Sequence, residues 1–198
     1  MFSGVSSTTS QKLQLDAGAF LKNYDVTQDT WATASTTKLI GATAGGGSFA
    51  AVPTIRRIEV DGVKGATKGF EALDEWVVTM TANMKELDAE VLKMALATGS
   101  STDVKSPSGV SANNYKKIVA SNDIQSSDYI NNITWFGRLS GSSLPIIIVL
   151  KNALCTNGLS LTTQDKAEGI VTLTLTGHYD PSNLDVPPFE IYYPTAAS

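Results

Sequence analysis

Cysteine, histidine and charge are all scarce in this chain of 198 residues, and no long apolar run occurs. The single cysteine, Cys155, excludes a disulfide within the chain and suits assembly in a reducing cytoplasm. Its neighbours Ala153 and Leu154 predict a buried thiol that behaves as a small hydrophobe. The strongest apolar run, residues 144–150, is far shorter than the roughly 20 residues of a membrane-spanning helix. The first residues lack the basic and apolar regions of a secretion signal, so we expect neither a membrane span nor a secretion signal.

The few charges do not favour nucleic-acid binding. Lys and Arg number 15 against 19 Asp and Glu, for a net charge of -4 and a pI near 4.9. A protein that grips phosphates needs clustered basic residues. The doublets Arg56-Arg57 and Lys116-Lys117 are interpreted as solvated or salt-bridged pairs. The charged fraction of 17% lies below the roughly 25% of soluble domains, which suits contact with identical copies. A β-rich domain with a Ser/Thr-rich surface is the plainer alternative.

Motifs for catalysis are missing or incomplete. The segment GATAGGGS has the glycine spacing of a phosphate-binding loop at Gly41 and Gly46, but the lysine is missing. His178 and Asp180 have no accompanying nucleophile motif. The carboxylates look like loop and helix-face charges, and no Cys/His set or calcium-loop spacing occurs. We therefore predict that the chain is not an enzyme and that it has no catalytic, cofactor-binding or metal-binding residues.

Apolar and β-branched patterns predict a mainly β chain. The clearest strand is 170–177, where Val171, Leu173 and Leu175 alternate with three threonines. A run apolar on both faces, 145–154, must be covered twice. Asn157-Gly158 gives a hairpin signal before 170–177. Further strands are predicted at 12–24, 54–60, 70–80, 115–120, 132–139 and 189–193.

One helix is expected, over residues 83–98, with Asn83 as its N-cap, Glu86 reaching back to the cap and Gly99 as its left-handed end. Residues 99–114 should be a surface loop, and 124–131 irregular or a short helical turn. A long connection is expected over residues 25–53, with only a short regular piece at 37–40.

Together these patterns predict an α+β, mainly β fold: two packed antiparallel sheets, as a sandwich or partly open barrel, flanked by one helix. We expect a single domain over residues 1–198. An N-terminal arm spans 1–12, a long inter-subunit loop 25–53 and a C-terminal arm 181–198, because the arms are rich in Ser, Thr and Pro.

Residues 38–69 are the most informative segment, because a glycine-rich stretch leads into a charged strand and a turn. The Asp61-Gly62 pair between two β-prone runs is a hairpin signal. Open sheet edges invite pairing with another chain, and closing a ring of subunits would remove them. Our inter-subunit contact candidates are Gly45, Gly46, Gly47, Phe49, Pro53, Arg56, Arg57 and Asp61.

The sequence IRRIEVDGVKG (55–65), followed by Trp76-Val77-Val78-Thr79-Met80 and the helix expected near Asn83, resembles the major tail tube proteins of long-tailed bacteriophages. The resemblance covers most of 12–180 and is strongest over 39–97 and 144–179. It implies sixfold rings that stack into a hollow tube, whose inner sheets join into a barrel through which the genome passes.

The resemblance further implies that residues 25–53 reach an adjacent ring, that the terminal arms bind neighbours, and that an acidic or threonine-bearing sheet faces the lumen. The implied partners are other copies of the chain, a tape measure protein, and terminator and initiator proteins, with DNA passing unbound. The implied location is the virion tail, after assembly in the host bacterial cytoplasm. The alternatives are the tube of a contractile injection system, which shares the fold, and a monomeric carbohydrate-binding or adhesin-like β-sandwich.

Overall fold

The computed structural model describes residues 3–104, 115–163 and 165–195. Its elements, in chain order, are η1 (Thr9–Gln11), β1 (Ala19–Lys22), α1 (Trp31–Thr37), β2 (Thr43–Arg57), β3 (Glu71–Met84), α2 (Ala89–Ala95), β4 (Gly99–Val104), β5 (Tyr115–Ala120), η2 (Ser126–Asp128), β6 (Ile130–Gly137), β7 (Ile146–Cys155), β8 (Val171–Thr176) and β9 (Phe189–Tyr192).

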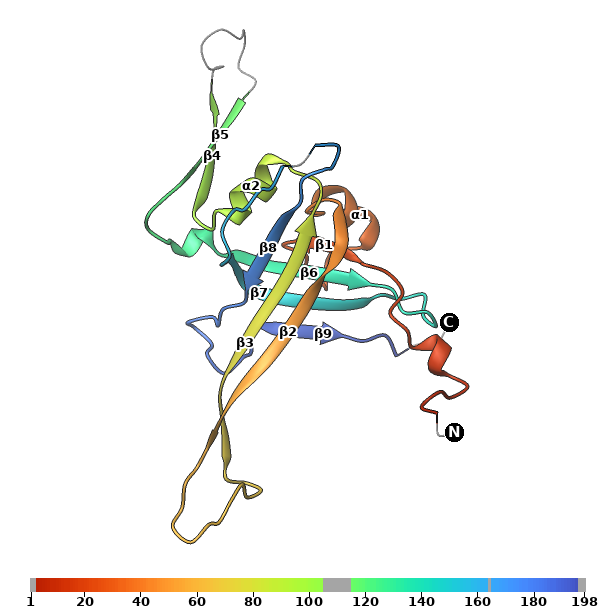
Figure 1. Cartoon of the computed structure of the whole chain (residues 1–198), viewed down its shortest axis with the longest axis vertical. Helices are drawn as coiled ribbons and strands as arrows, with labels where there is room; N and C mark the ends of the chain where they lie inside the picture. The colour runs from red at the N-terminus through yellow and green to blue at the C-terminus, as the bar shows by residue number, and fades with distance from the viewer. Residues whose placement is uncertain (1–2, 105–114, 164, 196–198) are drawn as a thin grey trace.

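Seven of the strands form one antiparallel sheet that folds into two crossing layers, with six strands in the order β1-β6-β7-β8-β3-β2 and β9 paired with β7 beside them (Figure 1). One layer contains β1, β6, β7 and β9, and the other contains β2, β3 and β8. The layers are joined because the last residues of β7, Leu154 and Cys155, pair with β8. Strands β4 and β5 form a separate two-stranded sheet.

The main hydrophobic core lies between the two layers. In β8 and in β3 from Val78 onward every second side chain is buried, so Val78, Met80, Leu173 and Leu175 are almost completely inaccessible to solvent. They pack with Leu150 and other residues of the opposite layer. Burying a large aliphatic side chain contributes about 1.5–3 kcal/mol, so this core is what holds the layers together.

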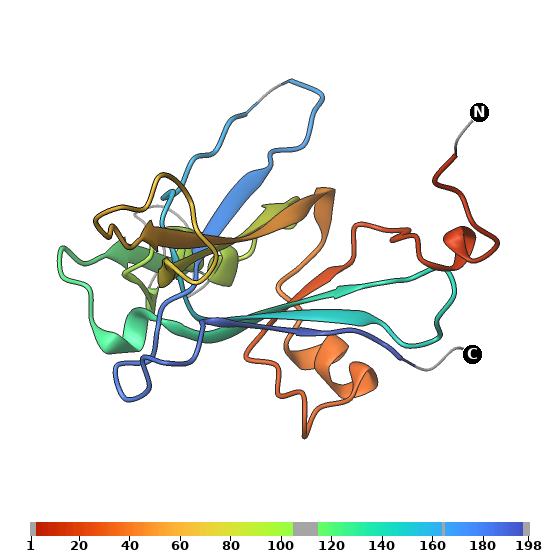
Figure 2. The same cartoon turned by 90° about the horizontal axis from the view of Figure 1, so that it is seen from below.

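Helix α1 covers part of the outer face of the β1-β6-β7-β9 layer (Figure 2). Ala34 of α1 is buried in a second cluster with Leu21, Tyr24 and Phe136. The helix begins at a reciprocal cap. The Thr30 side chain accepts a hydrogen bond from the Thr33 backbone N–H, and the Thr33 side chain accepts one from the Thr30 backbone N–H. Two backbone donors at the start of the helix are thereby satisfied. The rest of this outer face stays uncovered.

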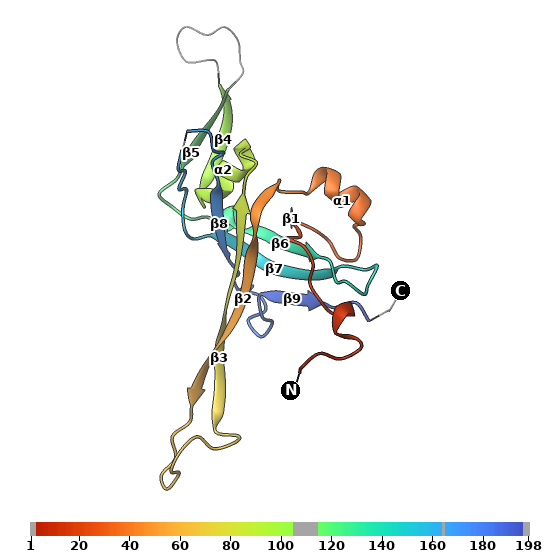
Figure 3. The same cartoon turned by 45° about the vertical axis from the view of Figure 1, so that its right-hand side comes forward.

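Two hairpins project from the sandwich at opposite ends (Figures 1 and 3). The longer one, which we call the β2–β3 arm, consists of the end of β2 and the start of β3, which stay paired beyond the layers. The connection at residues 58–70 forms its tip. The shorter one is the β4–β5 hairpin, which follows α2.

The expected fold class is confirmed: the chain is a mainly β, antiparallel α+β sandwich. Strands close to those expected at 70–80, 115–120, 132–139, 145–154, 170–177 and 189–193 are present, and Val171, Leu173 and Leu175 face the core. Cys155 is buried as expected, and burial raises the pKa of its thiol.

The helix expected at 83–98 is wrong in its extent. Asn83 lies in β3, where it pairs with Thr172, and the N-cap of α2 is Asp88, whose carboxylate accepts a 2.8 Å hydrogen bond from the Val91 backbone N–H. The left-handed residue after the helix is Ala97, with φ of 58°, while Gly99 begins β4. A second helix, α1, also corrects the expectation of one helix.

Three expected connections are also wrong in part. Residues 25–53 contain α1 and more than half of β2, so this segment is not a long loop. Asp61-Gly62 forms a turn within residues 58–70 and does not join the strands as a two-residue hairpin. Part of the loop expected at 99–114 is strand β4, and the remainder, 105–114, lies outside the described residues.

Both terminal segments form hydrogen bonds with the body of the sandwich, which free arms would not do. After η1, the backbone of Leu13 exchanges hydrogen bonds with Ser140 beside the β6–β7 connection, and in the strand expected at 12–24 only Ala19–Lys22 forms β1. In the C-terminal segment, β9 pairs with β7 over four residues. Residues 1–2 and 196–198 of the expected arms lie outside the described residues.

Candidate assembly surfaces and a polar groove

The predicted contact residues divide between two places. Gly45, Gly46, Gly47 and Phe49 lie in the body of the sandwich, where Phe49 packs against Phe189. Gly47 approaches its neighbour β3 so closely that a Cβ there would meet the Thr81 carbonyl oxygen at 2.0 Å. These glycines therefore permit close packing inside the fold, and the structure does not place them on a loop tip.

The other four predicted residues belong to the β2–β3 arm, where Asp61 lies at its tip. Arg56 forms an ion pair with Asp74, with 3.2 Å between Nε and Oδ2. Arg57 donates from its guanidinium to the Gly65 carbonyl at 2.5 Å. Both arginines thus bind within their own hairpin and stiffen it.

The arm also carries exposed aliphatic side chains that the prediction missed. Val52 pairs with Val77 on the side of the arm that continues the outer face of the body, and Ile55 pairs with Leu73 on the opposite side, because side chains alternate along β2 and Ile55 lies three residues after Val52. Their exposed fractions are 56%, 45%, 60% and 53%. We call these four residues the aliphatic arm patch. Glu75, opposite Thr54, lies between the two pairs. Exposed apolar groups that cluster in this way mark contact surfaces, and the alternation of Leu73, Glu75 and Val77 was the available sequence signal.

The same outer face changes character where it enters the body of the sandwich. Cross-strand pairs there are Thr79 with Thr176, Thr81 with Thr174, and Asn83 with Thr172, and Ser48 lies opposite Thr81. We call these seven residues the hydroxyl face. All are at least partly accessible to solvent and none carries a charge. The three threonines of 170–177 therefore belong to a broad neutral surface.

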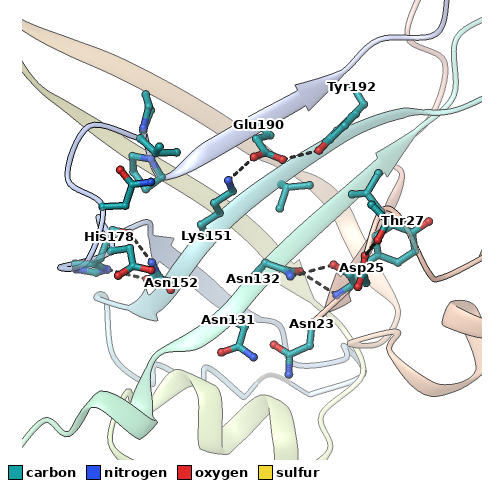
Figure 4. Close-up of a pocket in the computed structure, with 18 of the residues that line it drawn as sticks. Asn23, Asp25, Thr27, Asn131, Asn132, Lys151, Asn152, His178, Glu190 and Tyr192 are labelled. Carbon is teal, nitrogen blue, oxygen red and sulfur yellow. Dashed lines mark hydrogen bonds and ion pairs between the residues drawn. The ribbon is translucent and has the colours of Figure 1, made fainter.

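A polar groove of about 720 Å³ lies on the outer face of the other layer, beside the part that α1 covers (Figure 4). Lys151 of β7 pairs with Glu190 of β9 across the strands, and the Tyr192 hydroxyl donates to the same carboxylate at 2.5 Å. At the opposite side, Asn132 holds the turn after β1: it accepts from the Tyr24 backbone N–H at 2.9 Å and donates to the Tyr24 carbonyl at 3.0 Å.

The electrostatics of this groove are balanced by internal partners. The hydrogen bond from Lys151, and then that from Tyr192, lowers the pKa of the Glu190 carboxyl, while Glu190 raises the pKa of the Tyr192 hydroxyl. Other amides remain open to a ligand: among the described residues, the side chains of Asn23 and Asn131, drawn side by side in Figure 4, make no hydrogen bond. The groove therefore offers amide donors and acceptors beside a paired lysine and carboxylate.

His178 borders this groove in a structural arrangement. Its Nδ1 lies 3.0 Å from the Asn152 carbonyl, and Tyr129 packs edge-on against its ring at 5.0 Å between centroids. Within the part of the chain that the structure describes, no three His, Cys, Asp or Glu side chains are grouped to hold a metal ion. The described helices include none long and apolar enough to cross a membrane.

No protein-family model matches this chain, and no curated protein matches it either.

Proposed function

We propose that this chain is a structural subunit of a bacteriophage tail tube, in which rings of identical copies, six to a ring, stack into a hollow conduit for DNA. The observation that carries the proposal is the outer face of the β2-β3-β8 layer. This surface is neutral and hydroxyl-bearing in the body and continues on to the projecting arm at Val52 and Val77, while the other face of the arm exposes Ile55 and Leu73.

The two halves of this surface suit two different environments. An arm that projects from the body and exposes Val52, Ile55, Leu73 and Val77 gains free energy when another copy covers it. A face of threonines, Ser48 and Asn83 is wetted by water and offers phosphates no cation, so a polyanion can pass along it without being held. We assign the aliphatic arm patch to contact between rings and the hydroxyl face to the lumen.

The edges of this layer supply a route to ring closure. Strand β2 pairs with β3 on one side, and no described strand pairs with its other side. Strand β8 pairs with β7 at only two residues. Unpaired edges template pairing with a further chain, and a closed ring removes them. Such a tube has a tape measure protein and terminator or initiator proteins as partners and belongs to the virion tail.

The test is negative-stain electron microscopy of the purified full-length chain together with its mass in solution, before and after concentration. We expect rings or hollow tubes. A compact monomer at every concentration, also after seeding with the initiator complex, would overturn the proposal.

The polar groove favours a second candidate function, that of a monomeric carbohydrate-binding sandwich. Its volume of about 720 Å³ falls within the usual range of ligand pockets, roughly 300–1,000 Å³. Amides and carboxylates that converge on a concave sheet face match the vicinal hydroxyls of a sugar. Asn23, Asn131 and Asn183 are among the amides that line it.

Calorimetric titration with neutral oligosaccharides, maltotriose and chitotriose, tests this candidate. Binding that Asn131→Ala weakens, in a protein that stays monomeric, would favour it. Heats that remain at the level of dilution for both sugars would count against it.

A further inference from the structure

The pairs Asp61-Gly62 and Asn157-Gly158 share a chemical property besides their use in turns. Neither forms a two-residue hairpin here: the first lies within the tip of the β2–β3 arm, and the second begins the connection between β7 and β8. In such a pair the glycine nitrogen can attack the side-chain carbonyl carbon of the residue before it, because glycine has no side chain to shield that nitrogen. The surroundings of each pair therefore decide whether it reacts.

The surroundings of Asp61 leave this reaction open. One hydrogen bond closes its turn, from the Val63 backbone N–H to the Val60 carbonyl at 3.2 Å. Asp61 and Gly62 are both exposed, and the Asp61 carboxylate makes no hydrogen bond or ion pair with the residues that the structure describes. A Cβ built on Gly62 would meet nothing within 4 Å. No neighbouring group therefore hinders the approach of the carboxylate to the Gly62 nitrogen.

The surroundings of Asn157 oppose the same reaction. Its Nδ2 donates to the Thr172 carbonyl at 2.7 Å, and the Thr174 backbone N–H donates to its Oδ1 at 2.9 Å. Ring closure would make the planar carboxamide carbon tetrahedral and expel Nδ2 as ammonia, which breaks both hydrogen bonds. Because one hydrogen bond changes a population by about fivefold, the two together should slow the reaction by about 25-fold.

We propose that Asp61 is a site of spontaneous main-chain isomerisation in the folded chain, and that its hydrogen bonds protect Asn157 from the corresponding deamidation. At Asp61 the Gly62 nitrogen bonds to Cγ, and one carboxylate oxygen leaves as water with the Gly62 amide hydrogen and a solvent proton. A second water then opens the resulting cyclic imide. Opening at the main-chain carbonyl of Asp61 leaves an isoaspartate, in which the chain runs through Cγ, and the composition is unchanged.

The modification acts on the tip of the β2–β3 arm alone. An isoaspartate adds one carbon to the main chain inside the turn that Val60 and Val63 close. Asp61 and Gly62 belong to neither core cluster, so the fold should persist while the shape of the arm tip changes with age. The inference does not depend on the proposed tube, because the reaction needs only the single chain and water.

The experiment incubates the full-length chain at neutral pH, folded in buffer and unfolded in guanidinium chloride, and follows both pairs in tryptic peptides. Cleavage at lysine and arginine yields peptide 58–64 with the first pair and peptide 152–166 with the second. Mass spectrometry detects deamidation. Chromatographic separation of peptides of equal mass, and labelling by an isoaspartyl methyltransferase, detect isoaspartate. Asp185 is the internal control, since it is exposed but precedes Val186, whose branched side chain shields its nitrogen.

Isoaspartate should accumulate at Asp61 in the folded chain at a rate close to that in guanidinium chloride, and should stay at background at Asp185. Deamidation of Asn157 should be about 25-fold slower in the folded chain than in the unfolded one. Asp61→Ser should remove the methyltransferase signal of the folded chain, and Asp185→Ser should leave it unchanged. A folded chain without isoaspartate at Asp61, whether or not the unfolded chain forms it, would overturn the proposed site. Equal rates of deamidation in the two states would overturn the protection of Asn157.

Discussion

The substitution Ile55→Ser tests whether the aliphatic arm patch drives assembly. Full burial of a large aliphatic side chain contributes about 1.5–3 kcal/mol. Ile55 is 60% exposed in the free chain, so about 1–2 kcal/mol of that remains to be gained when another copy covers it. Since 1.4 kcal/mol corresponds to a factor of ten, the critical concentration for assembly should rise about tenfold.

The same substitution should change the stability of the unassembled subunit only slightly. Ile55 contacts its cross-strand neighbour Leu73 on the arm and lies outside both core clusters. Loss of a cross-strand pair costs about 0.2–1 kcal/mol, so the midpoint of thermal unfolding should move by only a few degrees. Leu73→Ser should act alike, and the double variant should give less than the sum, because the two side chains are in one pair.

The assay is pelleting across a concentration series, with the unpelleted concentration taken as the critical one. Ala72→Ser is the matched control, since Ala72 lies next to Leu73 on the opposite face of β3. A critical concentration that is the same for Ile55→Ser, Leu73→Ser and Ala72→Ser would refute the assignment of this patch to contact between copies.

Three further predictions concern the fold itself. Gly47→Ala should destabilise the chain by about 2 kcal/mol or more in urea unfolding, because its Cβ would meet the Thr81 carbonyl at 2.0 Å; unchanged stability would contradict the close approach. Leu173→Ala, in the core, should cost about 2–5 kcal/mol in the same assay, and a cost below 1 kcal/mol would contradict its complete burial. The pKa of the Glu190 carboxyl is lower in the folded chain than its ordinary value of 4.5, so its ionised form stabilises the fold above pH 4.5. This contribution is lost as the pH falls through the folded pKa. Glu190→Gln should therefore reduce the fall of the urea midpoint below about pH 4.5. An identical pH profile for the variant would show that the ion pair with Lys151 does not form.

Sequence patterns predicted those strands whose alternation of apolar and polar residues is uninterrupted. In β8, Val171, Leu173 and Leu175 are all buried, as a period of two requires. The helix at 83–98 failed because two periods overlap there. Met80, Ala82 and Met84 continue the period of β3, and pairing with β8 across 89 residues decides the competition in favour of the strand. Local propensity contains no information on that partner.

The glycines at 45–47 also depend on partners that are distant in the sequence. Glycine favours loops by its freedom, but here a Cβ at Gly47 would collide with Phe20 and the β3 backbone, and Gly46 lies against Ala17 with a left-handed φ of +67°. Because the contact partners come from distant segments, no local pattern distinguishes this use of glycine from a flexible connection. The predicted arm residues Arg56 and Arg57 were placed correctly on an exposed hairpin, while the aliphatic arm patch required the register of β2 on β3, including the shift between Thr54 and Ile55 that pairs Ile55 with Leu73.

That shift explains how one hairpin can serve two environments. The extra residue lies on β3, so the side chains of β2 keep their alternation, and Ile55, three residues after Val52, points to the opposite face. Leu73 pairs with Ile55 and lies on that face with it, while Val52 and Val77 continue the outer face that carries the hydroxyl groups in the body. A subunit that inserts its arm beside a neighbour's body therefore buries apolar side chains on both faces of the arm while the hydroxyl face remains wet, which is the division that a water-filled tube built from stacked rings requires.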